Sequence, residues 1–189
     1  MAGIRSVLVL VLGALLLAGC ETTPQVSVDY NPQYAFAGKT RFAVVRPANN
    51  AVVNDLMAQR ITGAIESALS ARGYAIVPSA QADMLVSFFV TSQDKADVHT
   101  YNTGFAYRRC WDPLRCAGWA SPEVDVRYYT EGTLLIDFVD PASKTLEWRG
   151  STSKRLPSKP SPADRDRIAK EVVEAIIAQY PPGSAAGVR

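Results

Sequence analysis

The chain has 189 residues, of which 48% are hydrophobic and 20% are charged, and its formal net charge is +2. This length is enough for one globular domain with a substantial hydrophobic core. A near-neutral chain has no basic stripe for phosphate backbones, so nucleic acid is excluded as an expected partner.

The N-terminal segment has the three parts of a secretory signal. Residues 1–6 carry one cation, residues 7–17 are almost wholly apolar, and small residues follow at 18–19. Eleven apolar residues are too few for a spanning helix, which needs about 20. An ordinary signal peptide cut near Gly19 is one interpretation. The other is lipidation, because Leu17-Ala18-Gly19-Cys20 resembles the lipobox of bacterial lipoproteins.

In the lipoproteins that this segment resembles, the cysteine thiol receives a diacylglyceryl group, the signal is cut before it, and the new amine is acylated. Stable anchoring needs at least two such chains. We therefore expect residues 1–19 to be removed and Cys20 to hold the protein on a lipid bilayer. Residues 20–25 would form the lipidated N-terminus and a tether, and five extended residues reach at most ~17 Å.

Two cysteines remain in the mature chain, Cys110 and Cys116. A free pair with five intervening residues is expected to form a disulfide in an oxidising compartment. The chain-entropy model gives so short a loop roughly 2–2.5 kcal/mol. A metal pair or a redox pair is the alternative, but metal sites need further ligands and redox motifs favour two intervening residues.

The first half of the mature chain predicts a strand–helix–strand unit after an initial strand. Residues 26–30 alternate apolar and polar, and residues 41–46 form a second predicted strand. Residues 53–72 have apolar positions at helical spacing, and Gly73 follows as a helix stop. A third predicted strand, at 74–77, follows directly after this helix. The helix is therefore expected to connect two parallel strands by a crossover.

The second half begins with a predicted strand at 84–91, after which the alternation fails. Residues 92–123 are interpreted as a long insert. Strand patterning returns at 124–130 and continues at 133–139, with Gly132 between them as a bulge or tight turn.

A hairpin and a helix complete the predicted domain. Residues 140–144 form the turn, and 145–151 form the return strand. Ser161-Pro162 begins a helix that ends before Pro181. We predict an α+β domain over residues 26–182: one mixed sheet of five or six strands, with two amphipathic helices on one face and a long aromatic, disulfide-closed insert. Residues 183–189 are an expected frayed tail.

The insert is the predicted partner surface. Seven of the chain's 17 aromatic residues lie between Tyr101 and Tyr129, interleaved with arginines. Aromatic residues and arginine dominate binding hot spots. The alternative is that the rings cover the open sheet face as core. The residues assigned to the surface are Tyr107, Arg109, Trp111, Arg115 and Trp119.

The sequence predicts no enzyme and no catalytic residues. His99 has no recognisable nucleophile nearby and is interpreted as a solvated loop residue. Asp137 is assigned to a solvent-facing strand position and Asp140 to a turn. No set of residues has the spacing of a metal-binding motif, so no metal site is predicted. No cofactor is expected beyond the lipid on Cys20.

Two blocks of the mature chain are distinctive, 131–134 (Glu-Gly-Thr-Leu) and 148–150 (Trp-Arg-Gly). With several other blocks they resemble one family of envelope lipoproteins, the domain-of-unknown-function family 4136. The resemblance implies the compartment and the fold, but no known activity. Lipoproteins with aspartate after the lipidated cysteine stay in the inner membrane of enteric bacteria, so Glu21 favours the outer membrane, facing the periplasm.

These observations favour a lipid-anchored, non-enzymatic binding or accessory module for an envelope protein, a glycan or a lipid head group. Two alternatives remain open. One is an envelope hydrolase with an unrecognised site. The other is a structural subunit that pairs with its partner through a sheet edge.

Overall fold

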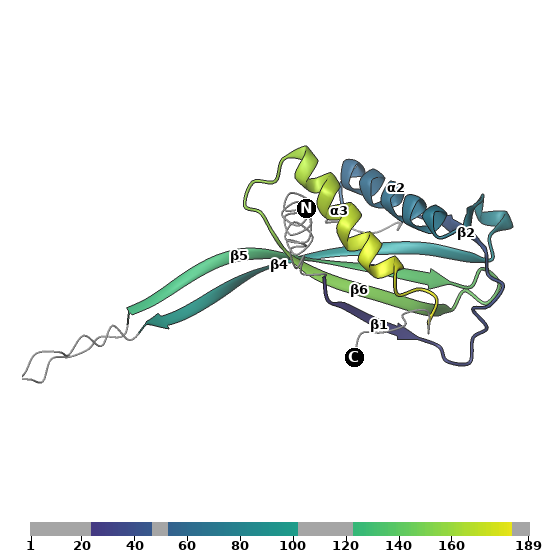
Figure 1. Cartoon of the computed structure of the whole chain (residues 1–189), viewed down its shortest axis with the longest axis horizontal. Helices are drawn as coiled ribbons and strands as arrows, with labels where there is room; N and C mark the ends of the chain where they lie inside the picture. Colours follow the sequence, from purple (N-terminus) through teal and green to yellow (C-terminus); the bar gives the residue numbers. More distant parts are fainter. Residues whose placement is uncertain (1–23, 47–52, 102–122, 183–189) are drawn as a thin grey trace, which may run out of the picture.

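The computed structural model describes residues 24–46, 53–101 and 123–182. These form one mixed sheet in the order β1-β6-β5-β4-β2-β3, with both helices on the same face (Figure 1). The predicted α+β architecture is confirmed, with six strands. None of the helices in these ranges is long and apolar enough to cross a membrane.

The elements follow the predicted order along the chain. The strands are β1 (Val26–Tyr30), β2 (Arg41–Val44), β3 (Ala75–Ile76), β4 (Met84–Tyr101), β5 (Glu123–Val139) and β6 (Leu146–Leu156). The helices are α2 (Asp55–Ala71), the 3-10 turn η2 (Ser79–Gln81) and α3 (Pro162–Ile177). β2 pairs in parallel with β3 and with β4, which confirms the parallel connection predicted through α2.

Both long helices begin and end where local chemistry dictates. The Asn54 side chain caps α2 by accepting from the Met57 amide at 2.9 Å, and Gly73 follows the helix with a φ of +84°. Ser161 and Asp164 form a capping box at the start of α3, with Pro162 in its first turn.

The core lies between the helices and the sheet. Alternate strand residues such as Val86, Ile136 and Phe138 are buried beneath the apolar faces of α2 and α3. Tyr180 joins this layer after α3, and its ring stacks on Phe138 at 4.2 Å between centroids. An edge contact also joins Phe138 to Trp148 at 5.0 Å.

The predicted insert at 92–123 is too long. Residues 92–101 continue β4 and pair with β5 in unbroken register as far as Tyr101 opposite Glu123. The apolar alternation fails in residues 92–101 because charged side chains occupy several of these positions. One of them, Lys95, forms an ion pair with Glu131 on β5. Cross-strand charge pairs and the backbone ladder therefore take the place of a buried face.

The bulge predicted at Gly132 is also wrong. Gly132 lies in regular register between Ser92 and Lys154, and the irregularity falls between Phe138 and Val139. Gly132 instead leaves room for the Leu156 side chain, which would lie 3.1 Å from an added Cβ. A close side chain, rather than a special backbone geometry, explains this glycine.

Candidate binding surface

The residues assigned to lipidation, disulfide and partner surface lie outside the described ranges. These are Cys20, Cys110 and Cys116, together with Tyr107, Arg109, Trp111, Arg115 and Trp119. Their predicted roles therefore stay predictions.

β4 and β5 continue beyond the rest of the sheet as a projecting ribbon. We call residues 92–101 and 123–132, which pair with one another, the arm. Residues 130–132 at its root still pair with β6, and Figure 1 shows the rest of the arm extending beyond the helices, β1 and β6. Ten strand residues span about 30 Å, so segment 102–122 joins the described residues far from the body of the sheet.

One face of the arm is apolar and exposed. By strand alternation it lies on the same face as the helix-covered part of β4 and β5. Val98 is 59% exposed, Val126 opposite it is 41% exposed, and Tyr128 is 80% exposed. An isolated two-stranded ribbon is marginally stable in water. This face therefore has the composition of a surface that is covered in a complex.

The opposite face of the arm is charged. Arg127 pairs with Asp125 at 2.8 Å, and Arg155 of β6 reaches Asp97 at 2.9 Å while its guanidinium lies over the Tyr129 ring at 4.1 Å. Charge pairs of this kind keep one face hydrated. The arm is thus amphipathic, with a hydrated face and an apolar face.

β4 has a described strand on its outer side only near its beginning. β2 pairs with β4 over Met84–Val86, and among the described elements no strand pairs with residues 92–98 on that side. A strand edge of this kind is a template for adding a strand from another chain. The apolar face and this edge therefore lie on the same element.

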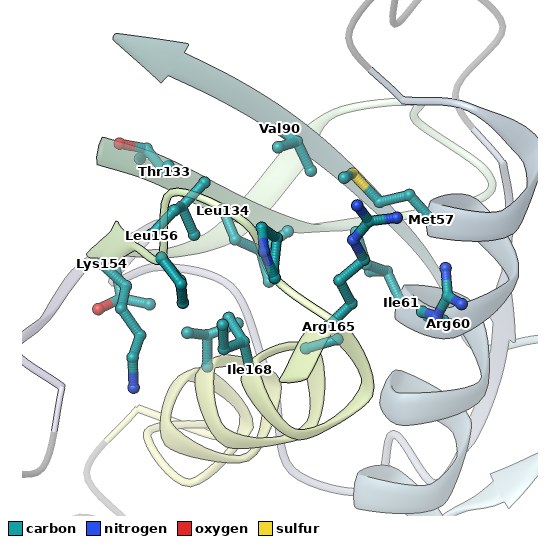
Figure 2. A pocket seen from close by; sticks show the side chains of 16 residues that line it. Met57, Arg60, Ile61, Val90, Thr133, Leu134, Lys154, Leu156, Arg165 and Ile168 are labelled. Carbon is teal, nitrogen blue, oxygen red and sulfur yellow. The ribbon is translucent and has the colours of Figure 1, made fainter. Parts of the chain in front are cut away.

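An apolar pocket opens where the arm leaves the body. It has a cavity volume of about 160 Å³ and lies between α2, α3, the middle of β5 and the end of β6, with Val90 of β4 also in its wall (Figure 2). Aliphatic side chains line it, including Met57, Ile61, Leu134, Leu156 and Ile168. Both nearby threonines already use their hydroxyls: Thr152 donates to the Gln25 carbonyl and Thr133 bonds to Ser153, each at 2.7 Å.

Three cations surround this pocket, one from each wall. Arg60 of α2 pairs with Asp166 at 2.5 Å, and Lys154 of β6 pairs with Glu171. Arg165 of α3 is exposed, and its guanidinium has no ion-pair partner among the residues that the structure describes. Figure 2 shows its side chain beside Met57 and Arg60. The pocket mouth is therefore positive.

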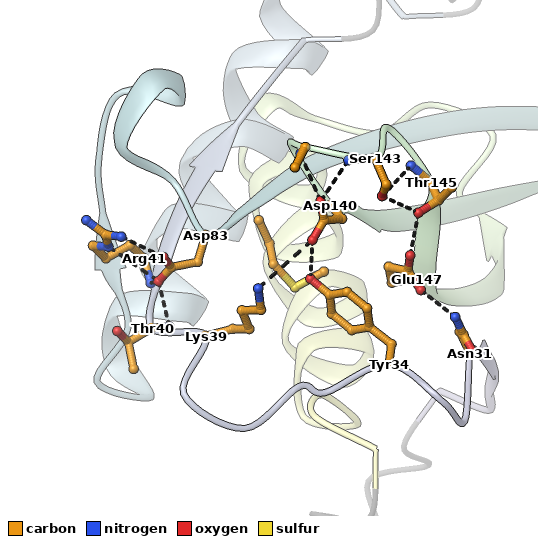
Figure 3. A network of polar contacts seen from close by, with 12 residues as sticks. Asn31, Tyr34, Lys39, Thr40, Arg41, Asp83, Asp140, Ser143, Thr145 and Glu147 are labelled. Carbon is orange, nitrogen blue, oxygen red and sulfur yellow. Dashed lines mark hydrogen bonds and ion pairs between the residues drawn. The ribbon is translucent and has the colours of Figure 1, made fainter.

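A polar network lies at the other end of the sheet (Figure 3). Asp140 accepts from the Tyr34 hydroxyl at 2.7 Å and from the Ala142 and Ser143 amides of its own turn. Burial, together with the bond to Asp140, raises the pKa of Tyr34. The Tyr34 bond, the turn amides and Lys39 lower the pKa of Asp140 to about 2.

Two further carboxylates in this network also hold loops. The Asp83 carboxylate accepts from the Arg41 guanidinium at 2.7 Å, which lowers the pKa of Asp83 below its usual range. Glu147 accepts from the Asn31 side chain at 2.8 Å. Each contact ties a connection to a strand end, so the network holds loops rather than bringing an acid and a base to one point.

We expect Asp140→Asn to destabilise the domain by about 1–2 kcal/mol at neutral pH, because two turn amides and Tyr34 lose a charged acceptor. The lowered folded-state pKa makes this contribution complete above pH ~4 and lost as the pH falls toward 2. Urea unfolding from pH 7 to pH 2.5 measures it. The gap between the wild type and Asp140→Asn should narrow progressively below pH ~4, and a constant gap would contradict the assignment.

The residues considered for catalysis do not converge. His99 is exposed and lies on β4 rather than in a loop, which corrects the prediction. Asp137 is only 5% exposed and pairs with Arg149, so the solvent-facing assignment is also wrong. Asp140 is a turn residue as predicted. Within the described ranges, no three His, Cys, Asp or Glu side chains are placed to hold a metal.

Sequence reasoning missed the arm and the pocket. The alternation of Val124, Val126 and Tyr128 did indicate a strand with an apolar face, but its partner strand lacks a matching pattern. The pocket is built from parts of α2, β4, β5, β6 and α3 that are separated along the chain, and no local signal marks it.

Solved structures that are similar to this chain are distant from it in sequence. A PDZ domain protein from Parabacteroides distasonis has a TM-score of 0.53 at 13% identity; the match covers 84% of this chain and 36% of that one. The PelC dodecamer from Paraburkholderia phytofirmans has a TM-score of 0.47 at 13% identity, with 82% and 96% covered. The chain thus spans about a third of the first protein, and this likeness concerns the fold alone.

The sequence itself places the chain in a family. No curated protein shows significant similarity to it. A family model does match, over residues 26–182, which is the whole of the sheet and both helices. The chain therefore belongs to DUF4136, a domain of unknown function.

Proposed function

We propose that this protein is a non-enzymatic accessory module of the cell envelope, held by lipid at Cys20 on the periplasmic side of the outer membrane. Its arm would bind an extended segment of another envelope protein. The lipobox-like stretch before Cys20 and the glutamate at position 21 support the location. The observation that carries the binding role is the exposed apolar face of the arm, formed around Val98, Val126 and Tyr128.

The outer edge of β4 at residues 92–98 supports strand addition as the mode of binding. Backbone groups there would hydrogen-bond to the incoming segment, while alternate side chains of that segment would pack beside Val98 on the apolar face. This combines the two binding roles considered for the sequence, a partner surface and a sheet edge.

The segment beyond the arm would extend the same surface. We propose that Cys110 and Cys116 form a disulfide there and that Tyr107, Arg109, Trp111, Arg115 and Trp119 contact the partner. A closed loop lowers the ordering cost of binding. The connection of this segment to Tyr101 and Glu123, at the end of the arm, supports a shared role with the arm.

The test compares two substitutions on opposite faces of β4. Val98→Glu adds a carboxylate to the apolar face, and Gln93→Glu adds one to an exposed position of the charged face. In native envelopes, chemical crosslinking of the acylated protein should capture one envelope protein. Burial of an unpaired charge opposes binding, so Val98→Glu should reduce the captured amount at least tenfold.

Gln93→Glu should change this capture less than twofold. Equal capture by wild type and Val98→Glu would contradict the proposal, as would capture of a second copy of this chain alone. Thermal unfolding of both variants checks that the fold is intact, because both positions are exposed and neither should shift the midpoint by more than a few degrees.

A further inference from the structure

The apolar pocket at the root of the arm has the features of a ligand site. Its floor is hydrocarbon, since the hydroxyls of Thr133 and Thr152 are already bonded within the protein. An occupant with polar groups along its length would lose hydrogen bonds to water there without replacement. The floor therefore fits an unbranched aliphatic or aromatic group rather than a sugar.

The mouth of the pocket adds a charge requirement. Arg60 and Lys154 are neutralised by Asp166 and Glu171, whereas the Arg165 guanidinium has no ion-pair partner among the described residues. A guanidinium matches a carboxylate with two parallel donors. The arrangement thus favours a ligand with a hydrocarbon body and one anionic end.

The cavity volume limits the length of the hydrocarbon. A cavity of about 150 Å³ with aliphatic walls holds one benzene molecule, and this pocket has about 160 Å³. Six to eight carbons, roughly, are therefore enough to fill it. A longer chain would leave its remaining carbons in solvent.

The pocket also lies beside the end of the domain that leads to Cys20. Thr152 lines the pocket and bonds to the Gln25 carbonyl, five residues after Cys20. Five residues reach at most ~17 Å. If Cys20 is lipidated as proposed above, the pocket mouth lies close to a bilayer, into which aliphatic acids partition. This step rests on the proposed function.

We propose that this pocket binds a medium-chain aliphatic carboxylate, with the chain between α2, α3 and Leu134 and the carboxylate on Arg165. The site is separate from the arm surface assigned to the protein partner. It would make the root of the arm responsive to fatty acids of the membrane.

A series of straight-chain carboxylates tests the fit. Isothermal titration of the mature acylated protein in lipid nanodiscs would use hexanoate, octanoate, decanoate and dodecanoate. Nanodiscs that carry the Ala169→Phe variant supply the reference, because Ala169 lines the pocket and a ring there fills it. Affinity should rise about fourfold per added methylene up to octanoate and then level off.

Substitutions separate the charge from the cavity. Arg165→Gln should weaken octanoate binding about fivefold, and Arg165→Lys should restore part of it. Lys170→Gln is the control, because Lys170 lies on the same helix but pairs with Glu174 and is not part of the pocket. It should change the affinity less than twofold. Octanol lacks the carboxylate, so its binding to the wild type should be weaker than that of octanoate by the same factor that Arg165→Gln produces with octanoate.

Several outcomes would overturn the proposal. These are an affinity that climbs by equal steps through dodecanoate, equal binding of octanol and octanoate, and unchanged binding in Arg165→Gln. No binding of any carboxylate would also overturn it and leave the pocket to an apolar side chain of a protein. Arg165 is exposed, so its variants are informative even if Ala169→Phe does not fold. The arm is tested separately, by crosslinking of the Val98→Glu variant. The proposed protein-binding function and the proposed fatty-acid site can therefore fail independently.

Discussion

Gly150→Ala is expected to destabilise the domain by at least about 2–3 kcal/mol, since the new methyl group has no space. An added Cβ would lie 2.4 Å from Cη2 of Trp148 and 2.6 Å from Cγ2 of Ile176. Neither neighbour can retreat easily, because both side chains are fully buried. Overpacking of this kind typically costs 1–3 kcal/mol and occasionally more. For a domain of this size the thermal midpoint should fall by about 5–10 °C.

Gly63→Ala is the matched control and should act in the opposite direction. Gly63 lies inside α2, and an added Cβ there meets nothing within 4 Å. Alanine in a helix interior is favoured over glycine by about 0.5–1 kcal/mol. Differential scanning calorimetry of both variants measures the two shifts. A stabilised Gly150→Ala would show that Trp148 packs differently.

The Trp-Arg-Gly block could be found in the sequence, but its physical meaning could not. Trp148 fills the core, Gly150 makes room for its ring, and Arg149 points to the other side of the sheet, where it pairs with Asp137. The ring is held by packing, since its indole nitrogen has no hydrogen-bond partner among the described residues. These three roles depend on residues outside the block: Asp137 on the preceding strand β5, and Ile176 on α3.

The predictable parts of the fold are those with local causes. Asn54 and Gly73 bound α2, and Ser161 with Asp164 begins α3, because caps act within one turn. The unpredictable part was the outer half of β4. Its residues alternate weakly, and their strand conformation depends on pairing with β5, about 30 residues later.

The candidate surfaces differ in how far the sequence indicates them. Most of the aromatic residues counted from Tyr101 to Tyr129 lie outside the described ranges, and of the described ones Tyr128 is exposed. The apolar pocket could not be predicted, because it needs Met57, Leu134 and Arg165 to be brought together by the fold. A surface built from one ribbon leaves a trace in the sequence, whereas a cavity lined by two helices and three strands does not.

Arg149→Met is the second substitution with a large expected effect. Arg149 holds both oxygens of Asp137, each at 2.6 Å, and the two residues lie opposite one another on β6 and β5. The Asp137 side chain is 6% exposed, so without Arg149 its charge would be desolvated and unpaired. Losing one partner of a fully buried pair costs about 3–5 kcal/mol. Because 42% of the Arg149 side chain is in solvent, we expect about 2–3 kcal/mol.

A double-mutant cycle separates the loss of the pair from the loss of packing. Asp137→Leu combined with Arg149→Met removes both charges and keeps the hydrocarbon volume, so it should recover most of the stability. Arg127→Met is the surface control, because its pair with Asp125 is largely exposed, and it should cost less than about 0.5 kcal/mol. Urea unfolding of the four proteins of the cycle gives the coupling energy. A value near zero would mean that solvent, rather than Arg149, satisfies Asp137, and that this face of the sheet is open to water.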